Sequence, residues 1–285
     1  MVSEEELRKK LWAAGRLAAR ITRDGSLNFD SQAAADYETA GFQGGMYPVV
    51  SGPDGIDAGL VCRSDIGLVM AFRGTTRTFE DWKNDFGGSF TPFPGHGRVH
   101  TGFINSVRSV EDSLIRRAVL LYPSQQPGGL YLTGHSKGGA MASLMAAELD
   151  RLRPEGLPLP KVVTFGAPRV GDSRFTETYP CEHTRYESFR DIVPHLPITP
   201  QESALLTVVM ENVTDWFSVF TQGDLCQYAP LGRLKDICPP GISVPCDIPG
   251  ISGETLNSFY YVVTQLILKG RFSELGKYHM DDYPG

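Results

Sequence analysis

The chain has few cysteines, no long apolar run and no excess of positive charge. Only five of its 285 residues are cysteine, an odd and low number that argues against a fold held together by disulfides. No apolar stretch reaches the ~18 residues that a membrane-spanning helix needs. The net charge of −6 is unfavourable for binding nucleic acid or anionic lipid surfaces. What remains is a globular protein whose 41% of hydrophobic residues supply a substantial core.

Three of the cysteines lie close together, at Cys226, Cys238 and Cys246, but their spacing fits no common zinc site. We expect reduced thiols, with one disulfide inside this cluster as the alternative, and neither a metal nor an organic cofactor. At the N-terminus, Ser3 and Glu6 form a capping box ahead of an amphipathic helix. Its acidic start and repeated charges do not resemble a secretory signal. We therefore expect a protein that is cytoplasmic, or secreted and mature.

Strand-like and helix-like segments alternate along the chain. They are two strands within residues 58–73, a helix over 103–122, a strand over 129–134 followed at once by a helix, a strand from 161, another from 184, and an apolar helix over 254–272. This alternation predicts an α/β fold with a mostly parallel central sheet and helices on both faces. No linker interrupts it, so we predict a single domain over residues 1–285. A segment rich in proline and glycine predicts a loop-rich insertion at about 200–253.

The sequence Gly-His-Ser-Lys-Gly joins the strand over 129–134 to its helix and contains the pattern G-x-S-x-G. Glycines at both flanks, Gly134 and Gly138, permit a tight turn that holds Ser136 strained and exposed above the sheet. The first amides of the helix favour negative charge at the same place. These features predict a nucleophile, and the alternative is a serine that only caps the helix. A phosphate-binding loop does not fit, because the order G-x-x-x-x-G-K-[ST] is missing.

A serine nucleophile needs a base, and the base needs an acid that orients it. After a strand-to-helix turn of this kind the chain order is serine, acid, histidine. Asp191 fits the acid, whereas its rival Asp172 looks like the N-cap of a short helix. The two histidines after Asp191 are His195 and His279. We predict His279 as the base, because His195 lies four residues from the acid, in the same loop.

Five motifs occur in the order "AFRGTT", "VHTGF", "TGHSKGGAMA", "VVTFGAPRVGD" and "RDIVPHLP". Together they resemble the class 3 (fungal-type) lipases, which have the α/β-hydrolase fold. The resemblance covers about residues 60–200, with weaker echoes in "YAPLGRL" and "YHMDDY". It implies a catalytic triad of Ser136, Asp191 and His279.

The resemblance also implies an oxyanion hole formed by the backbone N–H groups of Thr75 and Lys137. Many relatives have leucine at the position of Lys137, so the lysine predicts a more polar rim to the pocket. Losing one oxyanion donor typically costs about 10²- to 10³-fold in rate.

The family also implies a mobile lid after the oxyanion strand, in "TRTFEDWKNDFGGSFTPFPG". Phe79, Trp82 and Phe86 fall there at helical spacing and are the candidate lid and substrate-binding residues. We expect hinges at Gly87-Gly88 and at residues 92–95. The alternative is a surface helix that packs on the core.

These features predict a serine hydrolase of carboxylic esters that acts on acylglycerols through an acyl-enzyme. A phospholipase A, or a lipolytic effector directed at membranes, is the alternative, and a non-catalytic binding module is the remote one. The expected partner is a lipid or another ester, with a lipid–water interface as one setting. We expect neither nucleic acid binding nor a transmembrane segment.

Overall fold

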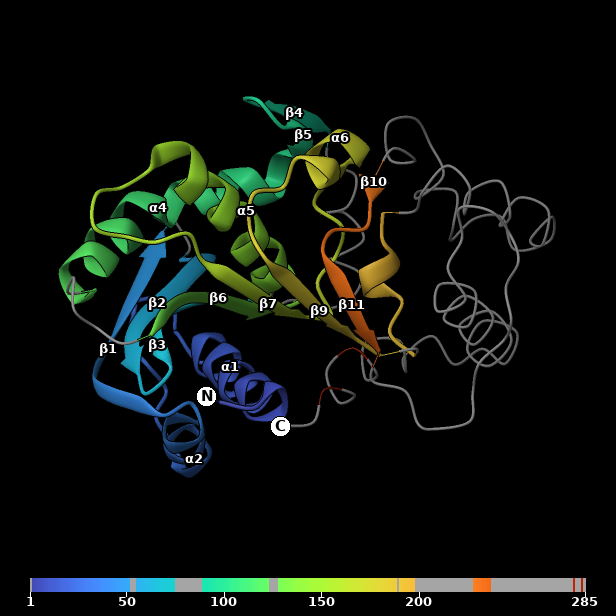
Figure 1. Ribbon diagram of the computed structural model, residues 1–285. Coiled ribbons are helices and arrows are strands. Elements are labelled where there is room, and N and C mark those ends of the chain that lie inside the picture. The colour runs from blue at the N-terminus through green and yellow to red at the C-terminus, as the bar shows by residue number, and fades with distance from the viewer. Residues whose placement is uncertain are drawn as a thin grey trace.

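The computed structural model in Figure 1 describes part of the chain. The described residues are 2–51, 55–74, 89–122, 128–188, 190–197 and 228–236, together with His279 and Tyr283. They form a seven-stranded sheet in the order β1-β2-β3-β6-β7-β9-β11 and a four-stranded sheet in the order β10-β8-β5-β4.

The seven-stranded sheet is parallel from β3 onwards, as the alternation of strands and helices predicted. Its strands are β1 (Phe42–Ser51), β2 (Asp57–Ser64), β3 (Gly67–Phe72), β6 (Gly129–His135), β7 (Lys161–Phe165), β9 (His183–Glu187) and β11 (Arg233–Asp236). The pairs β1–β2 and β2–β3 are antiparallel, whereas β3–β6, β6–β7, β7–β9 and β9–β11 are parallel. The carboxyl ends of the parallel strands therefore meet at one edge, where ligands bind in open α/β sheets.

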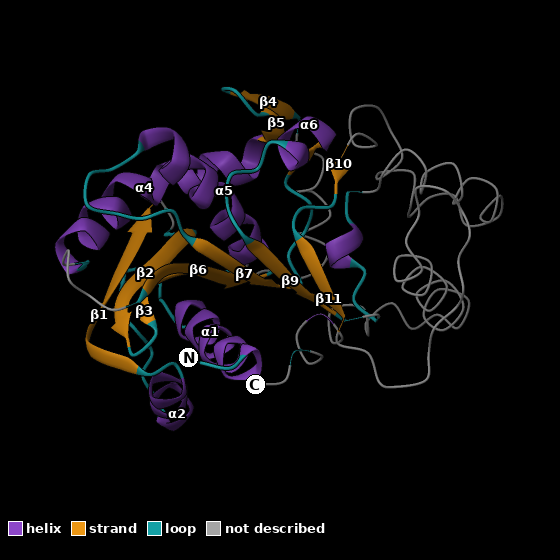
Figure 2. Cartoon of the chain, viewed as in Figure 1, coloured by secondary structure: helices purple, strands orange, loops and turns teal. Residues whose placement is uncertain are grey.

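Helices cover both faces of this sheet (Figure 2). One face carries α4 (Thr101–Leu121) and α5 (Lys137–Leu152), and the other carries α1 (Glu4–Ala19) and α2 (Ser31–Thr39). The sequence of β3 explains why both faces are buried: every residue of the strand is apolar or glycine. Leu68, Met70 and Phe72 pack in the core under α4 and α5, while Val69 and Ala71 pack in the core under α1.

The small antiparallel sheet was not predicted. It consists of β4 (Phe90–Phe93), β5 (Gly97–His100), β8 (Gly171–Asp172) and β10 (Tyr228–Ala229), beside the short helix α6 (Ser173–Glu177). Residues 92–95, one of the expected lid hinges, belong to the β4–β5 hairpin, in which Phe93 is 2% exposed. Strands this short give little periodicity, so their pairing depends on the surrounding fold.

The start of the chain follows its local signals. The Ser3 side chain accepts a hydrogen bond of 3.2 Å from the Glu6 amide and caps α1. Cys62 and Cys181 are free thiols, as expected, whereas the cluster of Cys226, Cys238 and Cys246 lies outside the described residues.

Within the expected insertion at 200–253, residues 228–229 and 233–236 form β10 and β11. The rest of it, and the apolar helix expected over 254–272, lie outside the described residues. None of the helices that the structure describes has the length and apolar content to cross a membrane.

Candidate active site

The turn between β6 and α5 holds Ser136 in a strained backbone conformation. Its φ of 58° and ψ of −131° are unfavourable for any residue with a side chain. Both flanking glycines are required by close approaches. A Cβ on Gly134 would lie 2.3 Å from the carbonyl carbon of Gly138, and one on Gly138 would lie 2.2 Å from the carbonyl oxygen of Phe72. The spacing G-x-S-x-G therefore follows from the crowding of β6, α5 and β3 at one point.

The side chain of Ser136 makes no capping hydrogen bond to α5, so the interpretation as a simple helix cap is wrong. The strain was predicted correctly, but the exposure was not, because Ser136 is only 5% exposed. The end of β3 passes close by: a Cβ on Gly74 would lie 3.6 Å from the Ser136 Cβ. The turn at Ser136 thus lies against the end of β3.

The fold brings Asp191 and His279 into contact although 88 positions separate them. The imidazole Nδ1 of His279 lies 2.7 Å from the Asp191 carboxylate Oδ2, and the two residues are 7% and 0% exposed. Asp172, the rival acid, accepts a hydrogen bond from the Phe175 amide and caps α6 instead. His195 ends the short 3₁₀ helix η1 (Val193–His195) that follows Asp191.

Two further donors hold the Asp191 carboxylate. The Tyr283 hydroxyl donates to Oδ2 at 2.7 Å, and the Val193 amide donates to Oδ1 at 3.0 Å. Burial would raise the pKa of Asp191, but the charge and hydrogen bond of His279, together with these two donors, outweigh it and lower the pKa. Asp191 is therefore an anion at neutral pH. Gly166 leaves room for this group, since a Cβ there would lie 2.9 Å from Asp191 Oδ2.

His279 contacts His135, which packs against further aromatic residues. The Nε2 of His135 lies 2.8 Å from the backbone oxygen of His279, so this nitrogen carries the proton and donates it. Burial first, and then the charge of His279, lower the pKa of His135 to about 3, which keeps the ring neutral. The ring centroid of Trp12, from α1, lies 5.5 Å from that of His135 and 5.8 Å from that of Tyr283.

Sequence reasoning missed this supporting layer. Tyr283 stood in the motif "YHMDDY" without a role, and His135 stood beside the serine. Trp12 offered no signal, because it comes from a helix more than 120 positions before the serine.

Of the two expected oxyanion donors, the structure describes only Lys137. Its amide is the first of α5, and the first amides of a helix have no acceptor inside the helix. The lysine side chain is 14% exposed and forms an ion pair of 2.8 Å with Asp57 at the start of β2. The ammonium group is thus bound to a carboxylate of the sheet. Thr75 lies outside the described residues, as do the lid candidates Phe79, Trp82 and Phe86.

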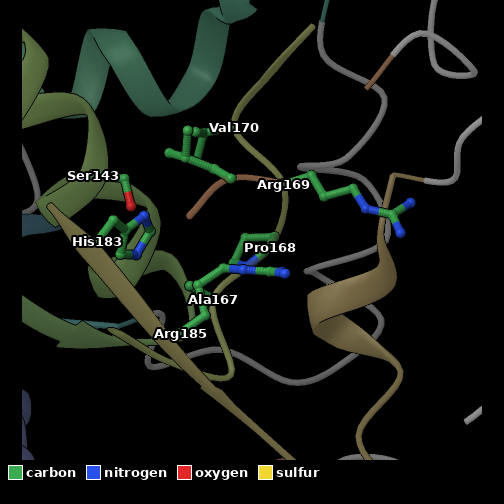
Figure 3. Close-up of a pocket in the computed structure, with 8 residues that line it drawn as sticks. Ser143, Ala167, Pro168, Arg169, Val170, His183 and Arg185 are labelled. Atoms are coloured by element: carbon green, nitrogen blue, oxygen red, sulfur yellow. The ribbon is translucent and has the colours of Figure 1, made fainter. Parts of the chain in front are cut away.

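A small cavity has Ser143 of α5, and His183 and Arg185 of β9, among its lining residues (Figure 3). The space open to the centre of a water molecule is about 10 Å³, which is room for one water. None of Ser136, Asp191 and His279 lines this cavity, so it is separate from the candidate active site.

Residues 69–201 match the model of the family described as lipase (class 3). This part of the chain belongs to the class 3 lipase family. Ser136 and Asp191 both lie inside the matched segment, whereas His279 lies beyond it.

Two curated relatives illustrate the range of the family. A lipase of Rhizomucor miehei is 33% identical over 142 residues, which are 47% of this chain and 38% of the relative. Phospholipase A1-IIalpha of Arabidopsis thaliana is 28% identical over 167 residues, 46% of this chain and 39% of the relative. The chain therefore spans about two-fifths of the length of these curated relatives.

The solved structure of the Rhizomucor miehei triacylglyceride lipase superposes with a TM-score of 0.60 and 22% identity. The alignment covers 82% of this chain and 81% of that one. This likeness shows that the fold is that of an α/β-hydrolase.

Proposed function

We propose that the protein is a serine hydrolase of carboxylic esters, with lipid esters as its substrates. One observation carries the proposal: the buried Asp191–His279 hydrogen bond, in a chain whose strained strand-to-helix turn presents Ser136. A histidine held at Nδ1 by an ionised acid is the arrangement that activates a serine hydroxyl. The membership of residues 69–201 in the class 3 lipases supports the same chemistry.

In the proposed reaction the Ser136 Oγ attacks the ester carbonyl carbon while the His279 Nε2 takes the hydroxyl proton. Asp191 stays ionised, fixes the tautomer through Nδ1 and stabilises the imidazolium. The backbone amides of Lys137 and Thr75 stabilise the oxyanion. Collapse of the tetrahedral intermediate breaks the ester bond, and His279 returns its proton to the departing alcohol. A water molecule then gives a proton to His279 and attacks the acyl carbonyl carbon. As this second tetrahedral intermediate collapses, the bond to Ser136 Oγ breaks, His279 returns the proton to Oγ and the acid leaves.

The test is hydrolysis of p-nitrophenyl esters from acetate to palmitate by wild type, Ser136→Ala and His279→Ala. We expect activity that is highest on medium or long chains, and a fall in kcat of at least about 10⁴-fold in either variant. His195→Gln serves as the matched control, because it removes the other histidine that follows Asp191. Activity that survives in His279→Ala and disappears in His195→Gln would assign the base to His195.

A phospholipase A is the second candidate, favoured by the similarity to phospholipase A1-IIalpha. It would use the same residues, so only the substrate separates the two. Mixed vesicles and triacylglycerol emulsions offered at equal ester concentration would decide: preferential release of fatty acid from phospholipid selects this candidate. A chain that neither hydrolyses any ester nor reacts with a serine-directed phosphonate would be a binding module.

A further inference from the structure

The segment Gly55–Ala58, at the start of β2, contacts both strand ends that carry the expected oxyanion donors. On one side, the Asp57 carboxylate binds the ammonium of Lys137, the residue directly after the nucleophile, at 2.8 Å. On the other side, the Ala58 carbonyl oxygen accepts a hydrogen bond of 2.9 Å from the backbone amide of Arg73. Arg73 immediately follows β3 and leads into Gly74.

The Arg73 side chain adds further hydrogen bonds to the same segment. Its guanidinium is buried, with 4% of the residue exposed, and donates to the carbonyl oxygens of Gly55 and Ile56. It also donates to the carbonyl oxygen of Ile21, at 2.5 Å. Burial lowers the pKa of the Arg73 guanidinium, and the negative charge of Asp57 opposes this shift. The end of β3 is therefore held to residues 55–58 through both backbone and side chain.

Burying this ion pair is not by itself an efficient way to stabilise the fold. The side chains of Asp57 and Lys137 are 17% and 14% exposed, and withdrawing two charges from water can cost more than their attraction returns. A well-packed apolar pair is often as stable. The charged pair adds a positional constraint. With the ammonium of Lys137 held 2.8 Å from the Asp57 carboxylate, the Lys137 backbone has fewer positions available. Ser109 of α4 donates to the second oxygen of Asp57 at 3.3 Å and so orients the carboxylate.

We propose that Asp57 is a positioning residue for the oxyanion hole, which acts through its ion pair to hold the Lys137 amide in place relative to the end of β3. The inference rests on the proposed function. Oxyanion donors lower the barrier only when they are fixed before the charge develops, and small displacements of such groups are costly. The two strand ends touch directly as well, since a Cβ on Gly74 would lie 2.9 Å from the His135 carbonyl oxygen. A shift at Lys137 therefore changes the geometry around Ser136.

The experiment uses Asp57→Asn, Lys137→Met, the double variant and a matched control, Asp65→Asn. Asp65 forms an ion pair of the same 2.8 Å with Lys10, at the opposite end of β2. For each protein, kcat and KM are measured on a soluble p-nitrophenyl ester, and thermal unfolding is recorded. We expect kcat to fall by about 10- to 100-fold in Asp57→Asn and in Lys137→Met, less than when an oxyanion donor is lost outright. KM should stay within about two-fold, because the oxyanion contact is made in the transition state and not in the bound substrate.

The double variant separates positioning from stability. Each single variant leaves a buried charge without its partner, whereas the double variant leaves none, so its melting temperature should recover towards wild type. Its kcat should stay low, because the connection to Lys137 is still missing. Asp65→Asn should keep kcat within about two-fold of wild type.

Three results would overturn the inference: a kcat in Asp57→Asn equal to that of Asp65→Asn, a rise in kcat, or recovery of kcat together with stability in the double variant. Failure of the proposed function would look different, because wild type itself would then hydrolyse no ester.

Discussion

Replacing Tyr283 by phenylalanine removes one of the donors that hold the Asp191 carboxylate. The hydroxyl lies 2.7 Å from Oδ2, and both residues are almost completely buried, with exposed fractions of 2% and 0%. Hydrogen bonds to charged groups contribute about 1.5–3 kcal/mol, so Tyr283→Phe should lower the free energy of unfolding by about 2 kcal/mol at pH 7. The carboxylate keeps His279 and Val193, so the fold should survive the change. Urea unfolding followed by circular dichroism measures the loss.

The loss should depend on pH in a defined direction. The pKa of Asp191 is lowered in the folded protein, so its ionised form contributes stability that is present above the unfolded value of about 3.9 and is lost as pH falls through the folded pKa. Without the tyrosine hydroxyl the folded pKa lies higher, nearer to the unfolded value. The difference between wild type and variant should therefore be constant above the folded pKa of the variant and shrink as pH falls through it.

Tyr179→Phe is the matched control, because its partly buried hydroxyl donates at 2.8 Å to a neutral acceptor, the backbone oxygen of Ser143. It should cost about 1 kcal/mol, with no dependence on pH. A loss in Tyr283→Phe that stays the same from pH 7 down to the pH at which wild type unfolds in acid would refute the reasoning, because the hydroxyl would then not be bonded to an ionised carboxylate.

Two further predictions concern the turn and the buried histidines. In Gly138→Ala the new Cβ would lie 2.2 Å from the Phe72 carbonyl oxygen, so we expect a loss of more than about 3 kcal/mol or no folded protein. Gly15→Ala in α1, whose nearest contact is 3.8 Å, should be neutral or stabilising by up to about 1 kcal/mol in thermal denaturation; equal losses in both would contradict the crowding argument. Burial, and secondarily the charge of Arg185, lower the pKa of His183 to about 3. The folded protein therefore keeps this ring neutral, whereas the unfolded chain takes up a proton below about pH 6.5. The free energy of unfolding should therefore fall as pH falls from 6 to 4. His183→Gln should reduce the slope of this free energy against pH by about 1.4 kcal/mol per pH unit. An unchanged slope in urea titrations would show that His183 is protonated in the folded state.

Local sequence signals predicted the central part of the fold well. The strand over 129–134, the turn at Ser136 and the following helix are encoded within about two dozen consecutive residues. Gly134 is fixed by a contact inside the turn, whereas Gly138 is fixed by the Phe72 carbonyl oxygen of β3. The capping of α1 by Ser3 and of α6 by Asp172 is equally local, because the donors lie three residues away. Short antiparallel strands such as β4 and β8 carry too few residues to show a pattern, so their pairing was missed.

The sequence by itself thus determined the nucleophile turn, the order of strands and helices and the shortlist of acids and bases, because these depend on neighbours along the chain. The sequence favoured His279 over His195 only from their positions along the chain, and the tertiary structure supplied the contact of His279 with Asp191. It alone added Tyr283 and His135, and it alone joined Lys137 to Asp57 across 80 positions. Contacts of this kind depend on which strand ends meet at one edge of the sheet, and burial then decides the protonation of the groups that meet there.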